Sequence, residues 1–511
     1  MAAWADGYFT EIQYTANAYA ELAPGFMAFA CLRHGVRPPD FGAGSTYLEL
    51  GCGQGFGLNL MAAANPDAQF WGVDFHPGQI DNAIRLARDG GLANVTFEDL
   101  SFEQLLEQPS GALPRFDMIA LHGIYSWVSA QARSTIVRLL DRLLKPGGLV
   151  YVSYNCLPGW ASLAPLQKFI AEHAAQGSGA PQARIIAALQ VAKRFADTPG
   201  SVFHASSAVR MRIEEAMKED PAYLAHEYLN KYSQPLFHAE VASDFEAARL
   251  TFAASANIAD DFMHLAAPGA LQDDILGVQD PILRQTLLDY SAVKPFRRDI
   301  FVRGRNSLDH FDQNDQLDGL CFALMTGADA VLTEFPIPIG RLTGQPVVYQ
   351  PLITALATGP KSLAELRALP ALAGAAYGAV LQALAILTGA RQIHPLRAGT
   401  TDAAPALRFN REVCRRVARG ETWNSVAAAA AGAPLRIPFS DQLAMHAVFE
   451  GIEDDAEAAR LAWPGMARSG RRLMINGQVL QDQAANEAEL AARIGDFRRY
   501  KLLLFQQLGA I

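Results

Sequence analysis

The sequence predicts a doubly wound α/β domain over roughly its first three hundred residues. From Thr46 onward, short apolar runs alternate with amphipathic segments, the pattern of strands joined by helices in a parallel sheet. A glycine-rich turn follows the first run, and acidic residues close the first three runs. Ligands bind outside the carboxyl ends of strands in an open α/β sheet, so these residues also mark where a site is expected.

Five apolar runs are predicted to form the first strands, with right-handed crossovers between them. Helices are expected over 58–66, which closes with Asn-Pro, over 77–91, which ends in two glycines, and over 130–144. A KPGG turn at 145–148 should lead into the fifth strand. The expected strands span 46–50, 70–75, 94–100, 116–123 and 149–155.

The later part of the chain predicts a helical insertion at 159–235 and two more strands of the same sheet, from Leu250 and over 296–304. A helix, turn, helix and strand-like tail within 351–395 suggest a winged-helix-like module in a C-terminal α+β accessory domain. Its second helix lacks basic residues, so we expect packing against the α/β domain rather than DNA contact. The expected domains are an N-terminal helical lid (1–45), a binding core (46–160), a helical insertion and regulatory region with the last sheet strands (161–305) and the accessory domain (306–511).

Composition excludes several classes of protein. A chain of 511 residues is too long for one hydrophobic core, so two or three domains are expected. A formal net charge of −9 argues against open, non-specific nucleic-acid binding. No stretch approaches the roughly 20 apolar residues of a membrane span, so we expect a soluble, cytoplasmic protein. The five cysteines lie far apart without metal-ligand spacing, which predicts reduced thiols and no metal site.

The string ELGCGQG, residues 49–55, closes the first strand and opens a helix. Its glycines let the backbone approach a ligand closely. A dinucleotide fingerprint needs a third glycine five positions after the first, where this chain has Phe56 or Leu58, so NAD is disfavoured. The candidates for ligand contact in this turn are Glu49, Gly51, Cys52 and Gly53.

Acidic residues at three strand ends make the glycine-rich turn stronger evidence for a ligand site. Glu49, Asp74 and Asp99 close the first, second and third strands, each 25 residues after the last. Asp74 is placed to accept both hydroxyls of a ribose, and Asp99 to accept from an adenine amino group. No residue is placed to bind phosphate, which favours a sulfonium nucleoside over a nucleotide.

Three further strings, LHGIYSWVS (121–129), VSYNCLPGW (152–160) and AHEYLNKYSQPLFHAEV (225–241), narrow the family. Together with RQTLLDYSAVKPFRRDIFVRG they resemble bacterial methyltransferases that carry a methyltransferase regulatory domain, a group that includes the rickettsial protein lysine methyltransferases. The resemblance covers about residues 8 to 305. It implies a seven-stranded Rossmann-like methyltransferase sheet and S-adenosylmethionine as cofactor. The cofactor contacts it implies are Gly51, Gly53, Asp74, Phe75, Asp99, Leu100 and His122.

Residues after the fourth and fifth strands are expected to face the cleft where the methyl group points. Aromatic faces can stabilise a cationic centre, and an amide can orient an amine. Trp127 and Trp160 are predicted cleft walls, and Cys156 a buried thiol. The candidate catalytic residues are His122, Tyr125, Tyr154 and Asn155.

The N-terminal segment departs from the resemblance. Family members often have Glu-Leu-Asn-Pro, whereas this chain has Ala23 at the third position. Any polar role of that asparagine is therefore absent. Tyr8, Tyr14 and Tyr19 form either part of a lid over the cofactor or ordinary aromatic packing.

Three functions remain open. The first is methyl transfer to a protein lysine, the second methyl transfer to a small molecule or natural product, and the third a non-catalytic scaffold that binds S-adenosylmethionine. An open, elongated cleft favours the first, a closed apolar pocket the second, and a blocked methyl path the third. Nucleic-acid partners are not expected, because no Asn-Pro-Pro-Tyr or Asp-Pro-Pro-Tyr string follows the fourth strand. The acceptor's proton is removed either by solvent, aided by the sulfonium charge, or by His122.

Overall fold

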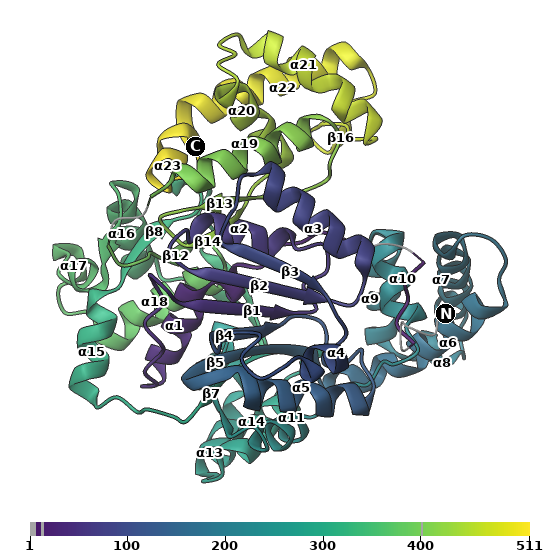
Figure 1. Cartoon of the computed structure of the whole chain (residues 1–511), viewed down its shortest axis with the longest axis vertical. Helices are drawn as coiled ribbons and strands as arrows, with labels where there is room; N and C mark the ends of the chain where they lie inside the picture. Colours follow the sequence, from purple (N-terminus) through teal and green to yellow (C-terminus); the bar gives the residue numbers. More distant parts are fainter. Residues whose placement is uncertain (1–6, 12–14, 400–401) are drawn as a thin grey trace.

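The computed structural model, which describes residues 7–11, 15–399 and 402–511, is built around one seven-stranded sheet (Figure 1). Its strand order is β3-β2-β1-β4-β5-β7-β6. The first five strands pair in parallel, whereas β7 runs antiparallel to both β5 and β6. The strands are β1 (Thr46–Leu50), β2 (Gln69–Asp74), β3 (Val95–Asp99), β4 (Phe116–Leu121), β5 (Leu144–Asn155), β6 (Leu250–Ser255) and β7 (Phe296–Arg303).

This topology confirms the predicted doubly wound sheet, including β6 and β7, the two strands that follow the insertion in the sequence. The strand order reverses between β1 and β4, so the chain leaves these two strands toward opposite faces. One expectation is wrong, because β5 begins at Leu144 rather than after the KPGG string. Buried Leu144 pairs with Phe116 before a register shift, so the string lies inside a strand irregularity.

Helices cover both faces of the sheet. On one face, α1, α2 and α3 bury their apolar sides in the larger hydrophobic core. On the other face, α5 and α11 pack in a second core with Phe116, Val152 and Phe301. Local signals define the helix starts, such as the Ser129 side chain that caps α5. These helices are α1 (Pro24–Arg33), α2 (Phe56–Ala64), α3 (Pro77–Asp89), α4 (Phe102–Glu107), α5 (Ala130–Leu143) and α11 (His238–Glu246).

The insertion forms a helical subdomain with its own small core, beside the carboxyl ends of the strands (Figure 1). Its helices are α6 (Ala164–Gln176), α7 (Pro181–Asp197), α8 (Val202–Ala205), α9 (Ser207–Ala216) and α10 (Pro221–Leu229). Three more helices connect the last two strands, namely α12 (Met263–Ala266), α13 (Gly269–Gly277) and α14 (Pro281–Ser291). In the part of the chain that the structure describes, no helix is both long and apolar enough to cross a membrane.

The C-terminal unit begins with a mixed α+β module that packs against α1, where the rings of Phe29 and Phe322 lie 5.3 Å apart. Its small sheet has the order β11-β8-β12. The module contains α15 (His310–Gly319), β8 (Cys321–Leu324), β9 (Glu334–Ile337), β10 (Gly340–Thr343), α16 (Pro346–Ala357), β11 (Lys361–Ser362), α17 (Leu363–Arg367), α18 (Tyr377–Gly389) and β12 (Ile393–Pro395).

The rest of the C-terminal unit is mostly helical and covers the outer side of α2 (Figure 1). Phe56 on α2 stacks on Trp423 with ring centroids 4.8 Å apart, and Asn65 donates to the carbonyl of Gly432 at 2.9 Å. The remaining elements are α19 (Ala404–Ala418), β13 (Ser425–Ala428), β14 (Ala433–Arg436), α20 (Phe439–Phe449), α21 (Asp455–Arg468), β15 (Met474–Ile475), β16 (Gln478–Val479), α22 (Gln483–Asp496) and α23 (Leu502–Gln507).

Trp423→Ala should destabilise the whole chain, because it removes the ring that covers Phe56 on α2. We expect the free energy of unfolding to fall by about 2–4 kcal/mol, somewhat less than the roughly 3–5 kcal/mol for a fully packed aromatic ring, because Trp423 is half-buried. Urea unfolding followed by circular dichroism measures this change. Leu461→Ala on α21, whose side chain is largely exposed, is the control and should change stability by less than about 0.5 kcal/mol. An equal loss in both variants would mean that the contact does not hold the two units together.

Candidate functional site

The turn between β1 and α2 has a shape that glycine alone fits well. Gly51, Gly53 and Gly55 all have positive φ angles, of 73°, 55° and 63°. A Cβ atom on Gly51 would lie 2.4 Å from the side chain of Ile124, and one on Gly55 would lie 2.6 Å from that of Ala83. The turn therefore lies against its neighbours and exposes backbone, rather than side chains, to the space above the sheet.

The Asp74 carboxylate is held in a fixed orientation at the end of β2. One of its oxygens accepts from the backbone N–H of Gly53 and the other from that of His76, both at 2.9 Å. Burial raises the pKa of Asp74, and these two hydrogen bonds oppose the shift. Each oxygen keeps one further acceptor position, so the group can still receive two hydroxyls.

A cavity of about 950 Å³ lies over this turn, at the carboxyl ends of β1, β2 and β4. Its volume is at the top of the range of about 300–1,000 Å³ that is typical of small-molecule sites. Of the candidate cofactor contacts, Glu49, Cys52, Phe75 and Leu100 line it. Asp99 is exposed and lies outside the lining, although it is near enough to raise the pKa of Asp74.

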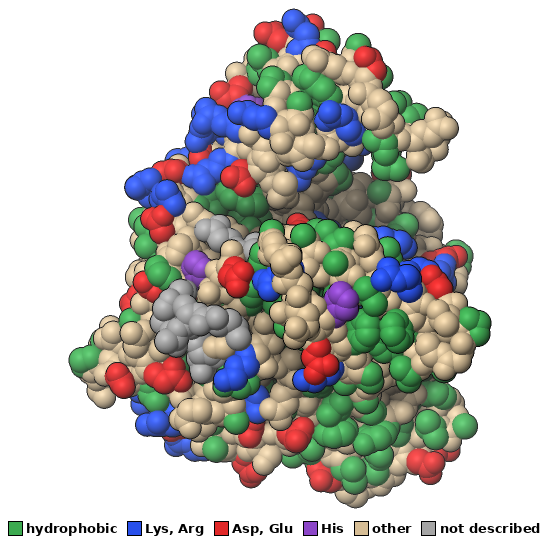
Figure 2. Space-filling view, turned by 90° about the vertical axis from the view of Figure 1, so that its right-hand side faces the viewer, with side chains coloured by type: hydrophobic (Ala, Val, Ile, Leu, Met, Phe, Trp, Pro, Cys, Tyr) green, Lys and Arg blue, Asp and Glu red, His purple; other side chains and the backbone are tan. Residues whose placement is uncertain are grey.

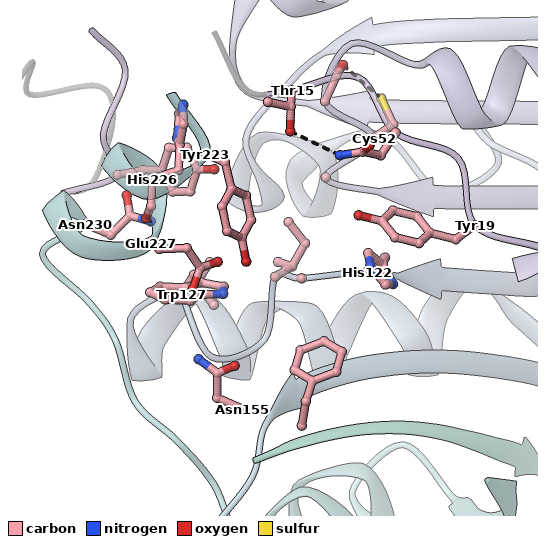
Figure 3. A pocket seen from close by; sticks show the side chains of 18 of the residues that line it. Thr15, Tyr19, Cys52, His122, Trp127, Asn155, Tyr223, His226, Glu227 and Asn230 are labelled. Atoms are coloured by element: carbon pink, nitrogen blue, oxygen red, sulfur yellow. Dashed lines mark hydrogen bonds between the residues drawn. The ribbon is translucent and has the colours of Figure 1, made fainter. Parts of the chain in front are cut away.

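The far side of the cavity comes from the helical insertion. Tyr223, His226, Glu227 and Asn230 on or just after α10 lie on the same side of the cavity as Trp127, while His122 and Tyr19 lie nearer the sheet (Figure 3). The sequence analysis did not single out these α10 residues. The string AHEYLNKY contains Glu227, but its pattern indicates only a helix, and no signal in the sequence places that helix above the sheet.

Carboxylates predominate among the charged side chains of the cavity. In the described part of the lining, Arg212 and Arg298 are the only arginine or lysine side chains. Arg212 donates to both carboxylate oxygens of Glu219, at 2.7 and 3.1 Å, and Arg298 pairs with Glu21 at 3.2 Å. The acidic side chains of the lining are Glu49, Asp74, Glu103, Glu215, Glu219 and Glu227. The cavity therefore favours a cationic ligand group over an anionic one.

Burial shifts two of these carboxyl groups toward their neutral form. Burial, with a smaller contribution from Asp74, raises the pKa of Glu49 from 4.5 to about 8. Burial also raises the pKa of Glu227 from 4.5 to about 7, against the opposing effects of Arg212 and a hydrogen bond from Tyr223. A cation beside either group would lower its pKa again.

His122 lines the cavity after β4, as predicted, but it is a weak base. Its Nδ1 lies 3.0 Å from the Tyr151 hydroxyl, and its ring lies against that of Tyr19, with centroids 3.8 Å apart. Burial lowers the pKa of His122 from 6.5 to about 4, with Arg298 adding to the shift and Glu21 opposing it. The imidazole is therefore neutral at physiological pH.

Of the other candidate catalytic residues, Asn155 faces the cavity and the two tyrosines do not. Successive side chains of a strand point to opposite faces, so Tyr154 and Asn155 cannot both face the cleft. Tyr154 points into the buried side, where its hydroxyl donates to Asp299 at 2.6 Å. Tyr125 turns toward α11 and donates to Asp244 at 2.8 Å. Their expected contact with substrate is wrong.

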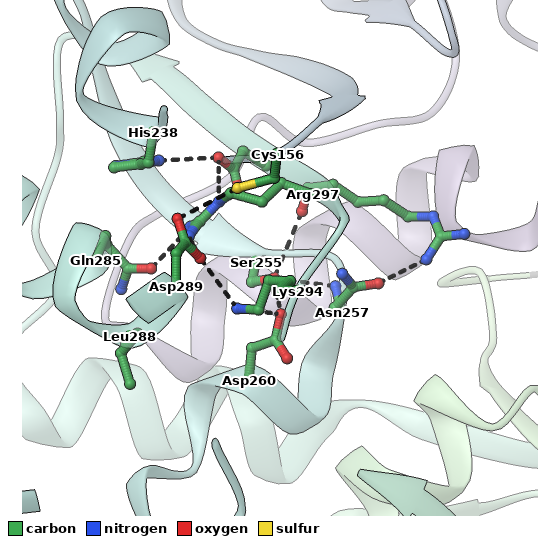
Figure 4. Close-up of polar contacts among 12 residues, drawn as sticks. Cys156, His238, Ser255, Asn257, Asp260, Gln285, Leu288, Asp289, Lys294 and Arg297 are labelled. Carbon is green, nitrogen blue, oxygen red and sulfur yellow. Dashed lines mark hydrogen bonds and ion pairs between the residues drawn. The ribbon is translucent and has the colours of Figure 1, made fainter. Parts of the chain in front are cut away.

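A network of buried charges lies behind the end of β5 (Figure 4). Arg297, only 2% exposed, donates to Asp289 at 2.6 Å and to Asp299 at 2.9 Å. Arg297 and Asp299, two charged side chains of β7, are thus buried and paired with each other. Cys156 lies in this network, and burial raises the pKa of its thiol well above the usual value. It contributes nothing to the cavity lining, in agreement with its prediction as a buried thiol.

The predicted cleft walls line the cavity, whereas the N-terminal segment agrees with its prediction only in part. Trp127 and Trp160 both line the cavity. Tyr8 also lines it, and its ring contacts those of Phe75 and His226 at 5.6 and 5.7 Å, so it bridges the sheet and α10. Tyr14 lies outside the described residues. In the described part of the predicted helical lid, α1 packs in the core. The lining residues Thr15, Ala16, Asn17 and Tyr19 lie before the short turn Ala20–Leu22 and are not helical.

The cavity is open to solvent. Met211 and Val293 belong to its lining yet are 58% and 79% exposed, so they lie where it opens.

Hydrophobic side chains gather on the lower part of the molecular face shown in Figure 2. The exposed apolar residues of the insertion include Phe195, Val202 and Met217.

Comparison with known families finds two matches in the first part of the chain. A family described as "Methyltransferase domain" matches residues 42–238, and one described as "Predicted methyltransferase regulatory domain" matches residues 220–303. An uncharacterized protein from Synechocystis is 32% identical over 99% of both chains. An uncharacterized protein from Rickettsia prowazekii is 25% identical over 60% of this chain and 55% of its own length.

Among solved structures, PKMT2 from Rickettsia typhi in complex with AdoHcy has a similar fold. The two structures align with a TM-score of 0.70 at 18% sequence identity, over 95% of this chain and 99% of the other. The shared fold therefore includes the insertion and the C-terminal unit as well as the sheet.

Proposed function

The chain belongs to the family of methyltransferases that carry a methyltransferase regulatory domain, and from this premise we propose that its methyl acceptor is a lysine side chain of a protein. It is an S-adenosylmethionine-dependent methyltransferase. The choice of acceptor is the proposed part. It is supported by the acidic, open cavity and by the resemblance to the rickettsial protein lysine methyltransferases.

The residues at the sheet end of the cavity suit S-adenosylmethionine. Asp74 offers two free acceptor positions to a ribose, and the turn of Gly51 and Gly53 presents bare backbone, because a Cβ on Gly51 would collide with Ile124. Glu49 provides a carboxyl group for the positive charges of the methionine part. Phe75 and Leu100 provide apolar contact for the adenine. When bound, this cofactor supplies a methyl group attached to a sulfonium, which is open to displacement.

The acidic lining of the cavity is the observation that carries the choice of acceptor. A lysine ammonium is attracted by these carboxylates, whereas the phosphates of a nucleic acid are repelled. Trp127 and Tyr223 offer aromatic faces to a cation. The exposed Met211 and Val293 at the opening give a polypeptide access, which a closed pocket for a small molecule lacks.

The chain's own residues chiefly position the reactants. In-line displacement requires the acceptor nitrogen to approach opposite the departing sulfur, so orientation accounts for much of the rate. Neutral His122, fixed by Tyr151 and Tyr19, borders the path between the two ends of the cavity. Asn155 offers its amide to the acceptor side.

Asp74→Ala should weaken binding of S-adenosylhomocysteine by about 1–3 kcal/mol, because two ribose hydroxyls lose a charged acceptor. Isothermal titration calorimetry measures the change. Asp81→Ala, on the exposed side of α3, removes a carboxylate outside the cavity and should leave the affinity unchanged. Equal affinity for the wild type and Asp74→Ala would refute the assignment.

The acceptor can be found by incubating the protein with heat-treated bacterial lysate and methyl-labelled S-adenosylmethionine. We expect the label in the protein fraction and, after acid hydrolysis, in methylated lysine. Gly53→Trp, which fills the turn above β1, is the control and should give no labelling. Label found only in small molecules would favour the alternative function.

His122→Asn should retain the pH profile of the wild-type rate. Since the pKa of His122 lies at about 4, the imidazole is neutral throughout an assay between about pH 6 and 9 and produces no inflection there. The substitution should instead change the affinity for S-adenosylmethionine, measured by calorimetry. Loss of about 10²-fold or more in turnover with unchanged affinity would identify His122 as the base.

A further inference from the structure

The cavity has a second end, remote from the Gly51 turn, whose chemistry the cofactor does not explain. Glu227 and Tyr223 come from α10, Trp127 from the loop after β4, and Asn155 from the end of β5 (Figure 3). Three separate elements thus bring a carboxyl, an amide and two aromatic rings to one place. This is the part of the lining that an acceptor side chain would reach.

Among the described residues, none forms a salt bridge with Glu227, and Arg212 is the cation that acts on its pKa. The neighbouring cation, Arg212 on α9, donates to both oxygens of Glu219, so its charge is largely neutralised there. Tyr223 donates a hydrogen bond to Glu227, and Tyr8 faces it from the N-terminal segment. The groups that act on its pKa are Arg212 and Tyr223, which lower it, and Glu219, which raises it, while Glu227 in turn raises the pKa of Tyr8 and of Tyr228.

Asn155 gives independent evidence that a polar ligand belongs here. It is 4% exposed and lines the cavity, yet its Nδ2 atom has no hydrogen-bond partner among the residues that the structure describes. A buried amide without a partner costs free energy, and such groups are normally satisfied by protein, water or ligand. Rotation of the amide can present either its oxygen or its nitrogen to the cavity, so an amine can satisfy it.

We propose that Glu227 accepts the proton of the acceptor lysine while Asn155 orients the resulting amine. The idea rests on the proposed function. The ammonium gives one proton to the Glu227 carboxylate, which becomes a neutral carboxylic acid, and the nitrogen keeps its electron pair. That pair forms the new N–C bond as the C–S bond breaks with its electrons going to sulfur. The proton on Glu227 then leaves to solvent, which restores the carboxylate.

The raised pKa of Glu227 suits this role. A carboxyl group with an ordinary pKa of about 4.3 is a weaker proton acceptor than a lysine amine by about a million-fold. With a pKa of about 7, the difference falls to about a thousand-fold. Desolvation of the ammonium between Trp127 and Tyr223 reduces it further.

The test compares the wild type with Glu227→Gln at saturating S-adenosylmethionine, between about pH 5.5 and 9.5, with heat-treated lysate protein as acceptor and methyllysine as the readout. The wild-type rate should reach a plateau above about pH 7. Glu227→Gln should be slower by about 10²-fold or more, and its rate should continue to rise with pH. Glu214→Gln makes the same change on an exposed residue of α9 outside the cavity and should match the wild type.

The pH dependence of thermal stability tests the ionisation of Glu227 without any methyl transfer, and so independently of the proposed function. Because burial raises the pKa of Glu227, ionising it destabilises the fold as the pH rises from its unfolded value, near 4.5, through about 7. The Tm of Glu227→Gln minus that of the wild type should therefore increase between about pH 5.5 and 8.5. Calorimetry with S-adenosylhomocysteine should give similar affinities for both proteins, which shows that the cofactor end is intact.

The possible results distinguish the two ideas. Methylation of lysine with the same pH profile in both proteins would overturn the role of Glu227 and leave the proposed function standing. A constant difference in Tm across this pH range would also overturn it, because Glu227 would then titrate normally. Absence of methyllysine with the wild type would overturn both ideas together.

Discussion

The antiparallel pairing of β7 with β5 determines how the rest of the site is arranged. It sets Asn155 beside Phe296, Tyr154 beside Arg297 and Ser153 beside Arg298. Because side chains alternate along a strand, this register sends Asn155 into the cavity and Tyr154 into the buried charge network on the other side. A slip of one residue would exchange these two environments and separate Tyr154 from the network of Arg297 and Asp299.

The regulatory segment is consequently part of the catalytic structure rather than an attachment to it. The region 220–303 supplies both α10, which forms the acidic end of the cavity, and β7, which fixes β5. Its buried Arg297 pairs with Asp289 and Asp299, so each charge has a partner where water cannot reach it. Removing one partner would leave the other charge buried alone, which is far more costly than losing the whole pair.

Burial is the main cause of the pKa shifts of three ionisable groups around the cavity. Burial favours the neutral forms of Glu49, Glu227 and His122, although it raises two of these pKa values and lowers the third. Glu49 and Glu227 therefore gain negative charge when a cation such as the sulfonium cofactor binds beside them. Under the proposed function, the acceptor ammonium is a second cation of this kind.

The C-terminal unit acts through packing. None of the described lining residues comes from beyond Arg298, whereas Trp423 and Gly432 cover the outer side of α2 and the residue that follows it. The helix that starts at the cofactor turn is therefore buried on both sides. In this way the unit supports the turn of Gly51 without contacting the cavity.

The sequence by itself determined the sheet and the cofactor end of the site. Apolar runs, glycines and acidic strand ends are local signals, and residues at the carboxyl ends of parallel strands meet at one edge, so Glu49 and Asp74 could be placed together without coordinates. The sequence did not predict which of these side chains are buried or which way they point. Asp99 proved exposed, and Tyr125 and Tyr154 proved to face away from the cleft, because the direction of a side chain depends on the register of its strand and the course of its loop.

Only the tertiary structure decided what lies opposite the cofactor turn. Glu227 is separated from Asp74 by about 150 residues of sequence, and the pattern around it indicates a helix without saying where that helix packs. Its place in the same cavity as Asn155 and its raised pKa both arise when the insertion folds back over the sheet and buries the Glu227 carboxyl group. Contacts between distant segments and the desolvation they cause are collective properties of the packed chain, and so no local pattern contains them.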